Sequence, residues 1–453
     1  MASQRHIFGT DGVRGLANKA PLDPETSLSL GRALARVYLG QGGKNRIVIG
    51  KDTRLSGYMI ENALSSGICS MGGEAIFLGP LPTPGIAFIT QAMRAAAGVM
   101  ISASHNPYYD NGIKFFDHDG YKLPDDLEAK IEGLLSSDAL KDGPTHAEVG
   151  RAYRVDDAAG RYIEYLKSTF PKELNLEGFK IVVDCANGAA YKVAPTVFEE
   201  LGAEVVALGV SPNGLNINEG CGALHPQGLS EAVKREGAQL GVALDGDADR
   251  LVLVDEQGQI VHGDRVIALC ALDLSERGLL AKQTAVVTVM SNLGLELAMQ
   301  GKGLQLRRVQ VGDRYVIDSM RREGFVFGGE QSGHLIFSHY STTGDGILAA
   351  LQVLSAMRRK AKPLSELASC MEVFPQVLLN VKVKERKELS QVAELCKLQK
   401  DIERSLGAKG RILLRYSGTE PLLRIMLEGE DLKKIEDYAQ SLKTEAVKAL
   451  GAA

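Results

Sequence analysis

The chain has 453 residues, of which 45% are hydrophobic and 24% charged; this is the composition of a folded globular protein that is too long for one core. Its formal net charge of −4, with no local run of lysine and arginine, argues against a nucleic-acid-binding surface. No apolar stretch reaches the roughly 18 residues of a membrane span or forms a signal region, so we expect a cytoplasmic protein without membrane contact. No cysteines form a C-x-x-C pair, so neither a zinc site nor disulfides are expected.

Three short β-branched runs along the chain end in turn residues and are each followed by a helix-like pattern, as in a βαβ unit. These runs start at positions 46, 180 and 285. Each is followed later by a second apolar run that ends in a polar loop, and these loops begin at positions 102, 245 and 328. We therefore predict three copies of one α/β module, each with one loop at the carboxyl end of a strand, where open α/β sheets bind ligands.

The last part of the chain has a different pattern. Residues 377–383 alternate like a half-exposed strand, residues 411–415 and 422–427 predict a hairpin, and residues 430–450 predict a charged amphipathic helix. The predicted architecture is α/β, with three similar α/β domains that have mixed sheets and a C-terminal α+β domain. We expect domains at residues 1–155, 156–256, 257–368 and 369–453.

Three carboxylates at alternate positions, Asp245, Asp247 and Asp249, point to one side of an extended turn and suit Mg²⁺ or Ca²⁺. An EF-hand is excluded, although Glu256 falls at its twelfth position, because Arg250 stands where that loop requires glycine and a strand-like run follows. The alternative is a solvated acidic turn. Because three like charges repel without a cation and the flanking runs look buried, the sequence favours a metal site. Mg²⁺ is preferred if a phosphate oxygen completes the coordination.

The segment from Ser102 to Pro107 offers two serines and His105 directly after a predicted strand. It is equally consistent with an Asn-Pro turn whose hydroxyl groups have no chemical role. The chain has no G-x-S-x-G elbow, which argues against a serine hydrolase. A serine near a metal loop suits phosphoryl transfer, with Lys114 as a possible cation or proton donor. These residues alone do not choose between Ser102 and Ser104.

A third polar segment combines arginines, hydroxyl groups and a glycine, namely Arg415, Ser417, Gly418, Thr419 and Arg424. Backbone N–H groups and hydroxyl groups of such a turn cradle an oxyanion, and arginine binds phosphate with a fork of donors. An ordinary hairpin turn is the alternative, and the two arginines favour phosphate.

The loop that begins at position 328 carries Glu330, Ser332 and His334 at alternate positions. On an extended loop these side chains share one side and can hydrogen-bond the hydroxyl groups of a sugar. The chain has no Walker loop and no strand–helix G-x-G-x-x-G motif, so neither a nucleoside triphosphate nor a dinucleotide is expected.

Together these segments, with the opening F-G-T-D-G-V-R-G at residues 8–15, resemble the α-D-phosphohexomutase superfamily over nearly the whole chain and in the family's order. The resemblance implies that Ser104 of the S-H-N-P motif is the phosphoserine, and that its phosphate and the three aspartates hold one Mg²⁺. It also implies that basic residues surround the reacting phosphoryl group as catalytic residues, namely Arg14, His105, Lys114 and Arg250. By the same resemblance, sugar contacts come from Glu330, Ser332 and His334, and distal phosphate contacts from Arg415, Ser417, Gly418, Thr419 and Arg424. Ala248 replaces a glycine often found in the metal loop, which leaves these expectations unchanged.

Residues 8–15 and 106–116 resemble the branch of this superfamily that acts on glucosamine phosphates. The implied reaction converts glucosamine 6-phosphate into glucosamine 1-phosphate through a 1,6-bisphosphate, for UDP-N-acetylglucosamine and cell-wall synthesis. A glucosamine or glucose 1,6-bisphosphate would prime the enzyme, and the family suggests a possible homodimer. The alternatives are phosphoglucomutase or phosphomannomutase activity, a Mg²⁺-dependent phosphatase and a non-catalytic sugar-phosphate-binding protein. The sequence leaves open whether Lys114 or His105 transfers the proton.

Overall fold

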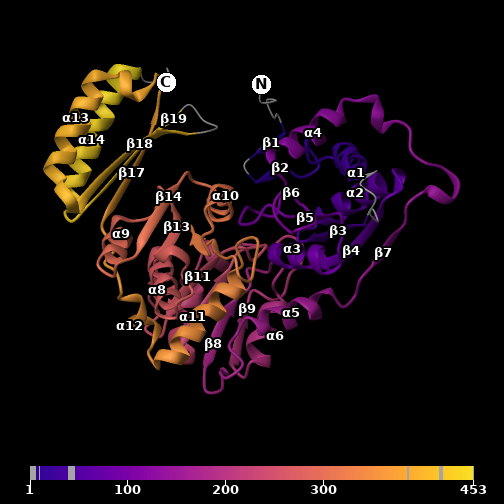
Figure 1. The fold of residues 1–453 in the computed structure, drawn as a ribbon, viewed down its shortest axis with the longest axis horizontal. Helices are drawn as coiled ribbons and strands as arrows, with labels where there is room; N and C mark the ends of the chain where they lie inside the picture. Colours follow the sequence, from indigo (N-terminus) through magenta and orange to yellow (C-terminus); the bar gives the residue numbers. More distant parts are fainter. Residues whose placement is uncertain (1–6, 10, 39–45, 385–386, 418–421, 452–453) are drawn as a thin grey trace. The chain divides into compact units, whose positions relative to one another are not determined.

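The computed structural model describes residues 7–9, 11–38, 46–384, 387–417 and 422–451, which form four β-sheets with flanking helices (Figure 1). The chain divides into two compact units. The first contains residues 1–290 and 306–369, and the second contains residues 291–305 and 370–453. Among the described residues, none of the helices combines the length and apolarity that crossing a lipid bilayer requires.

The first sheet has seven strands in the order β1-β2-β6-β5-β3-β4-β7. Its strands are β1 (Phe8–Gly9), β2 (Gly12–Leu16), β3 (Arg46–Lys51), β4 (Glu74–Pro80), β5 (Ala97–Ile101), β6 (Asp110–Phe116) and β7 (Ala152–Arg154). Strand β3 pairs in parallel with β4 and β5, whereas β6 runs antiparallel to β5. The chain therefore reverses in the loop between β5 and β6, which contains the S-H-N-P motif.

Helices cover both faces of the first sheet. Ile47 and Ile49 of β3 belong to a core that they share with α1 (Pro24–Tyr38), α2 (Gly57–Ser70) and α4 (Asp125–Leu135). Gly50 points to the other face, where a Cβ atom would lie 2.0 Å from Ile86 of α3 (Thr83–Ala92). Alternate residues of a strand point to opposite faces, so this β-branched run is buried on both sides as a central strand should be.

The second and third sheets repeat the arrangement of the first. The second has the order β12-β11-β10-β8-β9, with β8 (Lys180–Asp184), β9 (Glu204–Leu208), β10 (Leu240–Leu244), β11 (Leu251–Asp255) and β12 (Ile260–Val261). The third has the order β14-β13-β15-β16, with β13 (Thr284–Thr288), β14 (Gln305–Val309), β15 (Phe327–Gly329) and β16 (Leu335–Phe337). Their helices are α5 (Ala158–Ser168), α6 (Val193–Glu200), α7 (Gln227–Glu236), α8 (Gly263–Glu276), α10 (Asp313–Glu323), α11 (Gly346–Lys360) and α12 (Leu364–Ala368). Helix α9 (Leu293–Gln300) belongs to the second unit.

The same topology in all three sheets confirms the predicted repeat. In each sheet a parallel strand is followed by an antiparallel partner, and the pairs are β5 with β6, β10 with β11, and β15 with β16. The loop inside each pair is the polar loop that the sequence indicated. One boundary differs, because Gly328 and Gly329 pair with β13 and β16, so the third loop begins at Glu330 and not at Gly328. The four domain boundaries remain a prediction.

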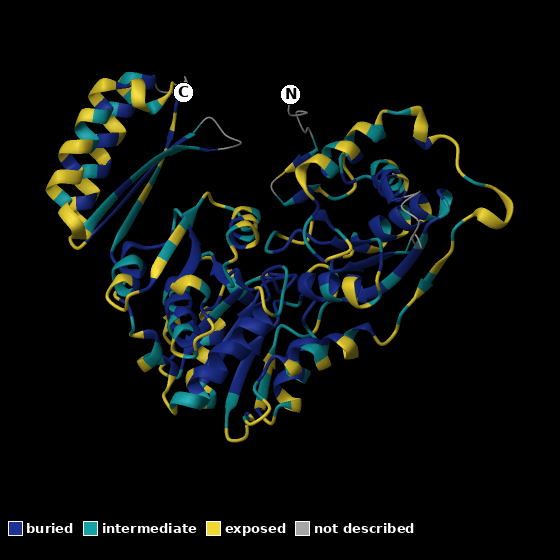
Figure 2. Cartoon of the chain, viewed as in Figure 1, coloured by how far each residue is buried: buried dark blue, intermediate teal, exposed yellow. Residues whose placement is uncertain are grey.

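The second unit contains a three-stranded antiparallel sheet in the order β17-β19-β18, with β17 (Gln376–Lys382), β18 (Gly410–Tyr416) and β19 (Leu422–Gly429). Helices α13 (Ala393–Leu406) and α14 (Leu432–Leu450) share its core. Figure 2 shows buried and exposed residues alternating along both helices, as expected for amphipathic helices on a sheet. The predicted α+β fold is therefore confirmed, whereas the sequence interpretation missed α13.

Candidate active site

The loop between β5 and β6 directs the Ser104 side chain toward the Asp loop of the second sheet. Ser104 has a φ of +53°, in the left-handed region that a non-glycine residue rarely adopts. Its Oγ donates a hydrogen bond of 2.6 Å to Oδ2 of Asp245, which lies 141 residues away in the sequence. The two loops that the sequence singled out independently are therefore in direct contact.

Ser102, the other candidate nucleophile, points elsewhere. Its Oγ donates to Oδ2 of Asp52 at 2.6 Å and accepts from the backbone N–H of Ser104 at 2.9 Å. Both serines are buried, but only the Ser104 hydroxyl group contacts the aspartate loop. The geometry thus separates two residues that the sequence pattern leaves equivalent.

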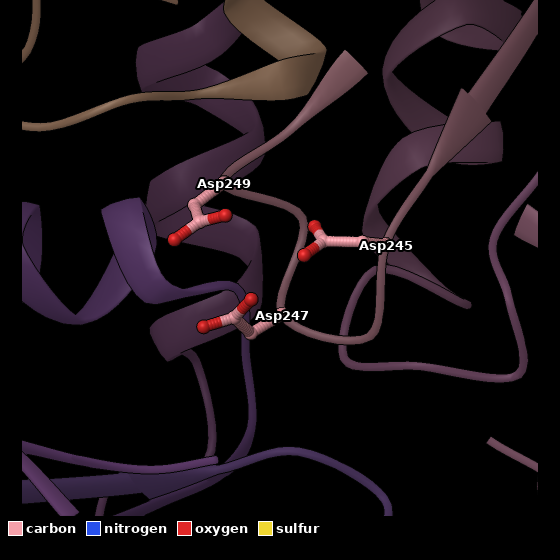
Figure 3. A group of neighbouring side chains, drawn as sticks. All are labelled: Asp245, Asp247 and Asp249. Carbon is pink, nitrogen blue, oxygen red and sulfur yellow. The ribbon is translucent and has the colours of Figure 1, made fainter. Parts of the chain in front are cut away.

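The three aspartates lie on the loop between β10 and β11, and their carboxylate groups converge (Figure 3). One oxygen from each of Asp245, Asp247 and Asp249 lies within 4.8 Å of the other two, and all three side chains are buried. Ala248, with a φ of +56°, turns the chain between Asp247 and Asp249. Oδ1 of Asp247 and Oδ1 of Asp249 have no hydrogen-bond partner among the described residues. Buried carboxylate oxygens without partners are costly, so the loop fits a hard cation.

Lys114 and Thr83 bind the same carboxylates from the first module. Nζ of Lys114, on β6, lies 2.8 Å from Oδ2 of Asp247, 3.3 Å from Oδ2 of Asp249 and 3.2 Å from Oδ2 of Asp11. Thr83, the first residue of α3, donates its hydroxyl group to Oδ2 of Asp247 at 2.6 Å and its N–H to the Asp247 carbonyl at 2.9 Å. The aspartate loop is therefore fixed by side chains of another sheet.

The charges around the loop shift the pKa values of its members in opposite directions. Burial, helped by the negative charges of Asp249 and Asp247, raises the pKa of Asp245 to about 8. Burial would also raise the pKa of Asp249, but Lys114 opposes it and holds this pKa well below its usual value. Burial disfavours the charged form of Lys114, yet the surrounding carboxylates, Asp11 first, raise its pKa well above the usual value. One site thus holds ionised groups beside a carboxyl group that a cation would deprotonate.

Three further basic residues named by the sequence lie around Ser104 and the aspartates. Nε of Arg250 is 3.9 Å from Oδ1 of Asp249, and Nε of both Arg250 and Arg14 is buried without a hydrogen-bond partner among the described residues. Nδ1 of His105 is 3.4 Å from Oγ of Ser104. Burial and the nearby charges of Arg250 and Arg14 lower the pKa of His105 to about 4. Guanidinium Nε–H groups that have no hydrogen-bond partner among the described residues can donate to the oxygens of a phosphoryl group.

The third polar loop is a tight turn between β15 and β16. The N–H of Glu330 donates to the His334 carbonyl at 2.9 Å, so the loop is closed and not extended as expected from the alternation of its residues. His334 is buried, and its Nε2 accepts from the N–H of Gly344 at 3.1 Å, whereas Ser332 is exposed. Nδ1 of His334 lies 3.8 Å from Oδ1 of Asp249. Of the three predicted sugar contacts, the structure therefore brings His334 next to the aspartate loop.

The arginines of the C-terminal hairpin belong to the second unit. Arg415 of β18 and Arg424 of β19 are directly opposite in the antiparallel register. Burial, and then the charge of Arg424, lower the pKa of Arg415, and Nε of Arg424 is buried without a hydrogen-bond partner among the described residues. The N–H of Ser417 donates to the Leu422 carbonyl at 2.8 Å, which closes the hairpin. Like charges directly opposite each other are unfavourable, so this pair suits an anionic ligand. Gly418 and Thr419 lie outside the described residues.

Several residues near Ser104 and the aspartates were absent from the sequence interpretation. Asp11 belongs to the opening motif and could have been found there. Burial would raise its pKa, but the positive charges of Lys114, Lys122 and Arg14 hold this pKa well below its usual value. Thr83 and Asn218 carry no local signal, since their partners lie more than 100 residues away.

Comparison with known proteins finds similarity over nearly the whole chain. The models of the phosphoglucomutase/phosphomannomutase family match in four parts: α/β/α domain I at residues 5–141, domain II at 160–258, domain III at 262–374 and the C-terminal domain at 378–445. The curated phosphoglucosamine mutase of Citrifermentans bemidjiense is 58% identical over 450 residues, which is 99% of each chain. That of Syntrophotalea carbinolica is 59% identical over 452 residues, covering 99% of this chain and 98% of the relative.

Solved structures share the fold. A phosphoglucomutase/phosphomannomutase family protein from Burkholderia thailandensis is 25% identical with a TM-score of 0.82, covering 99% of this chain and 98% of the other. The N-acetylphosphoglucosamine mutase of Aspergillus fumigatus, solved in complex with GlcNAc-6P and magnesium, is 19% identical with a TM-score of 0.68, covering 98% of this chain and 96% of the other.

Proposed function

This chain belongs to the phosphoglucomutase/phosphomannomutase family, and we propose that it is a mutase that interconverts glucosamine 6-phosphate and glucosamine 1-phosphate. The choice of sugar is supported by relatives that are 58% and 59% identical over nearly the whole chain and are named phosphoglucosamine mutase. A phosphoglucomutase or phosphomannomutase activity is the alternative within the family.

The aspartate loop would hold one Mg²⁺ through Asp245, Asp247 and Asp249, with an oxygen of phosphorylated Ser104 as a further ligand. Carboxylate and phosphate oxygens are the donors that Mg²⁺ prefers, and two carboxylate oxygens of the loop have no hydrogen-bond partner among the described residues. When bound, the ion would neutralise negative charge on the phosphoryl oxygens. Arg14 and Arg250 would donate to the same oxygens, since Nε of each is without a hydrogen-bond partner among the described residues.

The reaction would proceed in two phosphoryl transfers. The phosphoryl group of Ser104 would pass to the 1-hydroxyl group of glucosamine 6-phosphate, and the product is the 1,6-bisphosphate. Of the two candidates for the hydroxyl proton, His105 is the acceptor, because the burial of Lys114 is outweighed by the surrounding carboxylates, which raise its pKa and keep it protonated. The bisphosphate then turns around and returns its 6-phosphoryl group to the Ser104 hydroxyl group, which leaves glucosamine 1-phosphate. A glucosamine or glucose 1,6-bisphosphate would prime an enzyme that has lost its phosphate. Arg415, Ser417 and Arg424 are suited to hold the phosphate that does not react.

The hydrogen bond between Oγ of Ser104 and Oδ2 of Asp245 carries this proposal. In this contact the Ser104 hydroxyl group lies against the carboxylate group that would bind the metal, which supports metal-assisted phosphoryl transfer with Ser104 as the nucleophile. A phosphatase would use the same arrangement, but it would release inorganic phosphate with every turnover. A mutase returns the phosphoryl group to Ser104 and releases none.

The test compares kcat/KM for glucosamine, glucose and mannose 6-phosphates, with Mg²⁺ and a trace of bisphosphate, while inorganic phosphate is measured in parallel. We expect the highest value for glucosamine 6-phosphate and no stoichiometric phosphate release. A preference for glucose or mannose would replace the substrate assignment, and steady phosphate release would replace the mutase by a phosphatase.

Phosphorylation of Ser104 can be tested on the purified protein by intact-mass analysis and peptide mapping. A fraction of the protein should be heavier by about 80 Da, the mass that one phosphorylation adds. The extra mass should be absent from Ser104→Ala, which should also be inactive, and should remain in Ser102→Ala as the matched control. Full activity of Ser104→Ala would remove the nucleophile from the proposal.

A further inference from the structure

We propose that Asn218 is a positioning residue for phosphoryl transfer: it holds the backbone of the Ser104 loop from the second module, so that the Ser104 hydroxyl group faces Asp245. This inference rests on the proposed function for the role of Ser104, and it adds a residue that neither the motifs nor the family resemblance indicated.

The Ser104 loop needs external support because of its conformation. A φ of +53° is unfavourable for serine, and such a residue persists only where its surroundings over-determine it. This support comes through the carbonyl oxygens of Ser104 and Asn106. Each of these carbonyl oxygens accepts hydrogen bonds from two different side chains.

The first of these side chains is Arg54, which is fully buried. Its Nη2 donates to the carbonyl oxygens of Ser104 and Asn106, both at 2.9 Å, and its Nη1 donates to the carbonyl oxygen of Pro107. Its Nε donates to Oδ2 of Asp52 at 2.8 Å. Arg54 lies shortly after β3 in the same module, so it gives the loop its shape within the first sheet.

Asn218 reaches the same two carbonyl groups from the second module. Its Nδ2 donates to the Ser104 carbonyl at 2.9 Å and to the Asn106 carbonyl at 3.1 Å. Asn218 is buried, has a φ of +60°, and its own N–H donates to the carbonyl oxygen of Ala186 in the loop after β8. Asn218 therefore ties the Ser104 loop to the module that carries the aspartates.

The backbone of the aspartate loop meets the same point. A Cβ atom on Gly246 would lie 2.5 Å from the Ser104 carbonyl oxygen and 2.9 Å from Nδ2 of Asn218. The Ser104 carbonyl, the Asn218 amide and Gly246 are thus packed together, one residue away from Asp245. A shift at this junction changes the position of the serine hydroxyl group relative to the carboxylate groups, and misplacement by about 1 Å can lower a rate by 10²-fold.

Two substitutions separate positioning from packing. Asn218→Ala removes both donated hydrogen bonds and leaves Arg54 as the remaining donor to the two carbonyl oxygens. Asn218→Asp keeps the shape but places carboxylate oxygens, which accept and do not donate, against two carbonyl oxygens. We expect kcat to fall by about 10-fold in the alanine variant and by roughly 10²-fold in the aspartate variant, with KM for the sugar phosphate unchanged.

The control is Asn216→Ala in the same loop. The Asn216 side chain accepts from the N–H of Asn213 at 2.9 Å and donates to the carbonyl oxygen of Ser211 at 3.1 Å, so it orders the loop without touching Ser104. Its kcat should stay near the wild-type value. Equal losses in Asn216→Ala and Asn218→Ala would overturn the proposal, as would an aspartate variant that is at least as active as the alanine variant. Thermal unfolding identifies a variant that fails to fold. If the aspartate variant does so, the kcat of the alanine variant, compared with that of Asn216→Ala, decides whether Asn218 positions the Ser104 loop.

A second readout keeps this inference separate from the choice of sugar. The rate at which glucose 1,6-bisphosphate phosphorylates Ser104, followed by intact mass, should fall in the order wild type, alanine variant, aspartate variant. If the wild-type protein is phosphorylated but does not turn over glucosamine 6-phosphate, the substrate assignment is refuted. The order of the three phosphorylation rates then still tests the role of Asn218. Equal phosphorylation rates in all three proteins would refute the role of Asn218.

Discussion

Asp247→Asn tests the metal site with the least disturbance of the fold. Oδ2 of Asp247 accepts from the Thr83 hydroxyl group at 2.6 Å and from Nζ of Lys114 at 2.8 Å, and the amide oxygen of asparagine can keep both contacts. The amide nitrogen then replaces Oδ1, the buried oxygen that has no partner among the described residues. The substitution therefore removes one negative charge and one metal donor while the shape stays the same.

The expected loss follows from the charge that is removed. A metal contributes several kcal/mol to the stabilisation of a phosphoryl-transfer transition state. A loss of about 2.7 kcal/mol through the missing carboxylate lowers kcat by roughly 10²-fold, since each 1.36 kcal/mol is a factor of ten. The affinity for Mg²⁺ should fall as well, because the site keeps two of its three carboxylates.

The assay measures kcat at saturating sugar phosphate over a Mg²⁺ titration, together with calorimetric Mg²⁺ binding. Asp255→Asn is the matched control, because it makes the same change of charge at the end of β11. The Asp255 carboxylate accepts hydrogen bonds from the backbone N–H groups of Gln257 and Gln259, and it is not one of the three converging carboxylates. The control should keep its Mg²⁺ affinity. A kcat and a Mg²⁺ affinity of Asp247→Asn near the wild-type values would refute the metal site.

Two further substitutions test the cations around the substrate. Arg415→Gln should raise KM by about 10- to 160-fold, since a hydrogen bond to a charged group is worth roughly 1.5–3 kcal/mol. It should not lower the unfolding temperature, because it also removes the charge opposite Arg424. An unchanged KM would mean that the phosphate binds elsewhere. Lys114→Met should destabilise the metal-free protein by about 3–5 kcal/mol, because it removes the cation that pairs with the buried Asp247. Mg²⁺ should restore part of this loss in calorimetric unfolding, and a metal-free variant as stable as the wild type would contradict the charge argument.

The sequence determined the features that depend on local periodicity. The three β-branched runs became β3, β8 and β13, and the loops that follow the later strands are turns at the carboxyl ends of β5, β10 and β15. The spacing of Asp245, Asp247 and Asp249 was sufficient to predict converging carboxylates, since all three lie on one short loop. Helix α13 was missed although it is amphipathic, because Val392 stands at its N-cap position and no capping side chain marks its start.

Tertiary structure alone decided how the side chains of these loops are used. The chemistry of the segment left Ser102 and Ser104 open and the family resemblance implied Ser104, whereas the contact with Asp245 across 141 residues shows which of the two hydroxyl groups faces the aspartates. The partners of Lys114, and the hydrogen bond from Asn218 to Ser104, likewise join different modules. Periodicity along a chain reports which face of a strand or helix is buried, but it carries no information about which distant group lies opposite. That is set by the packing of one sheet edge against the next.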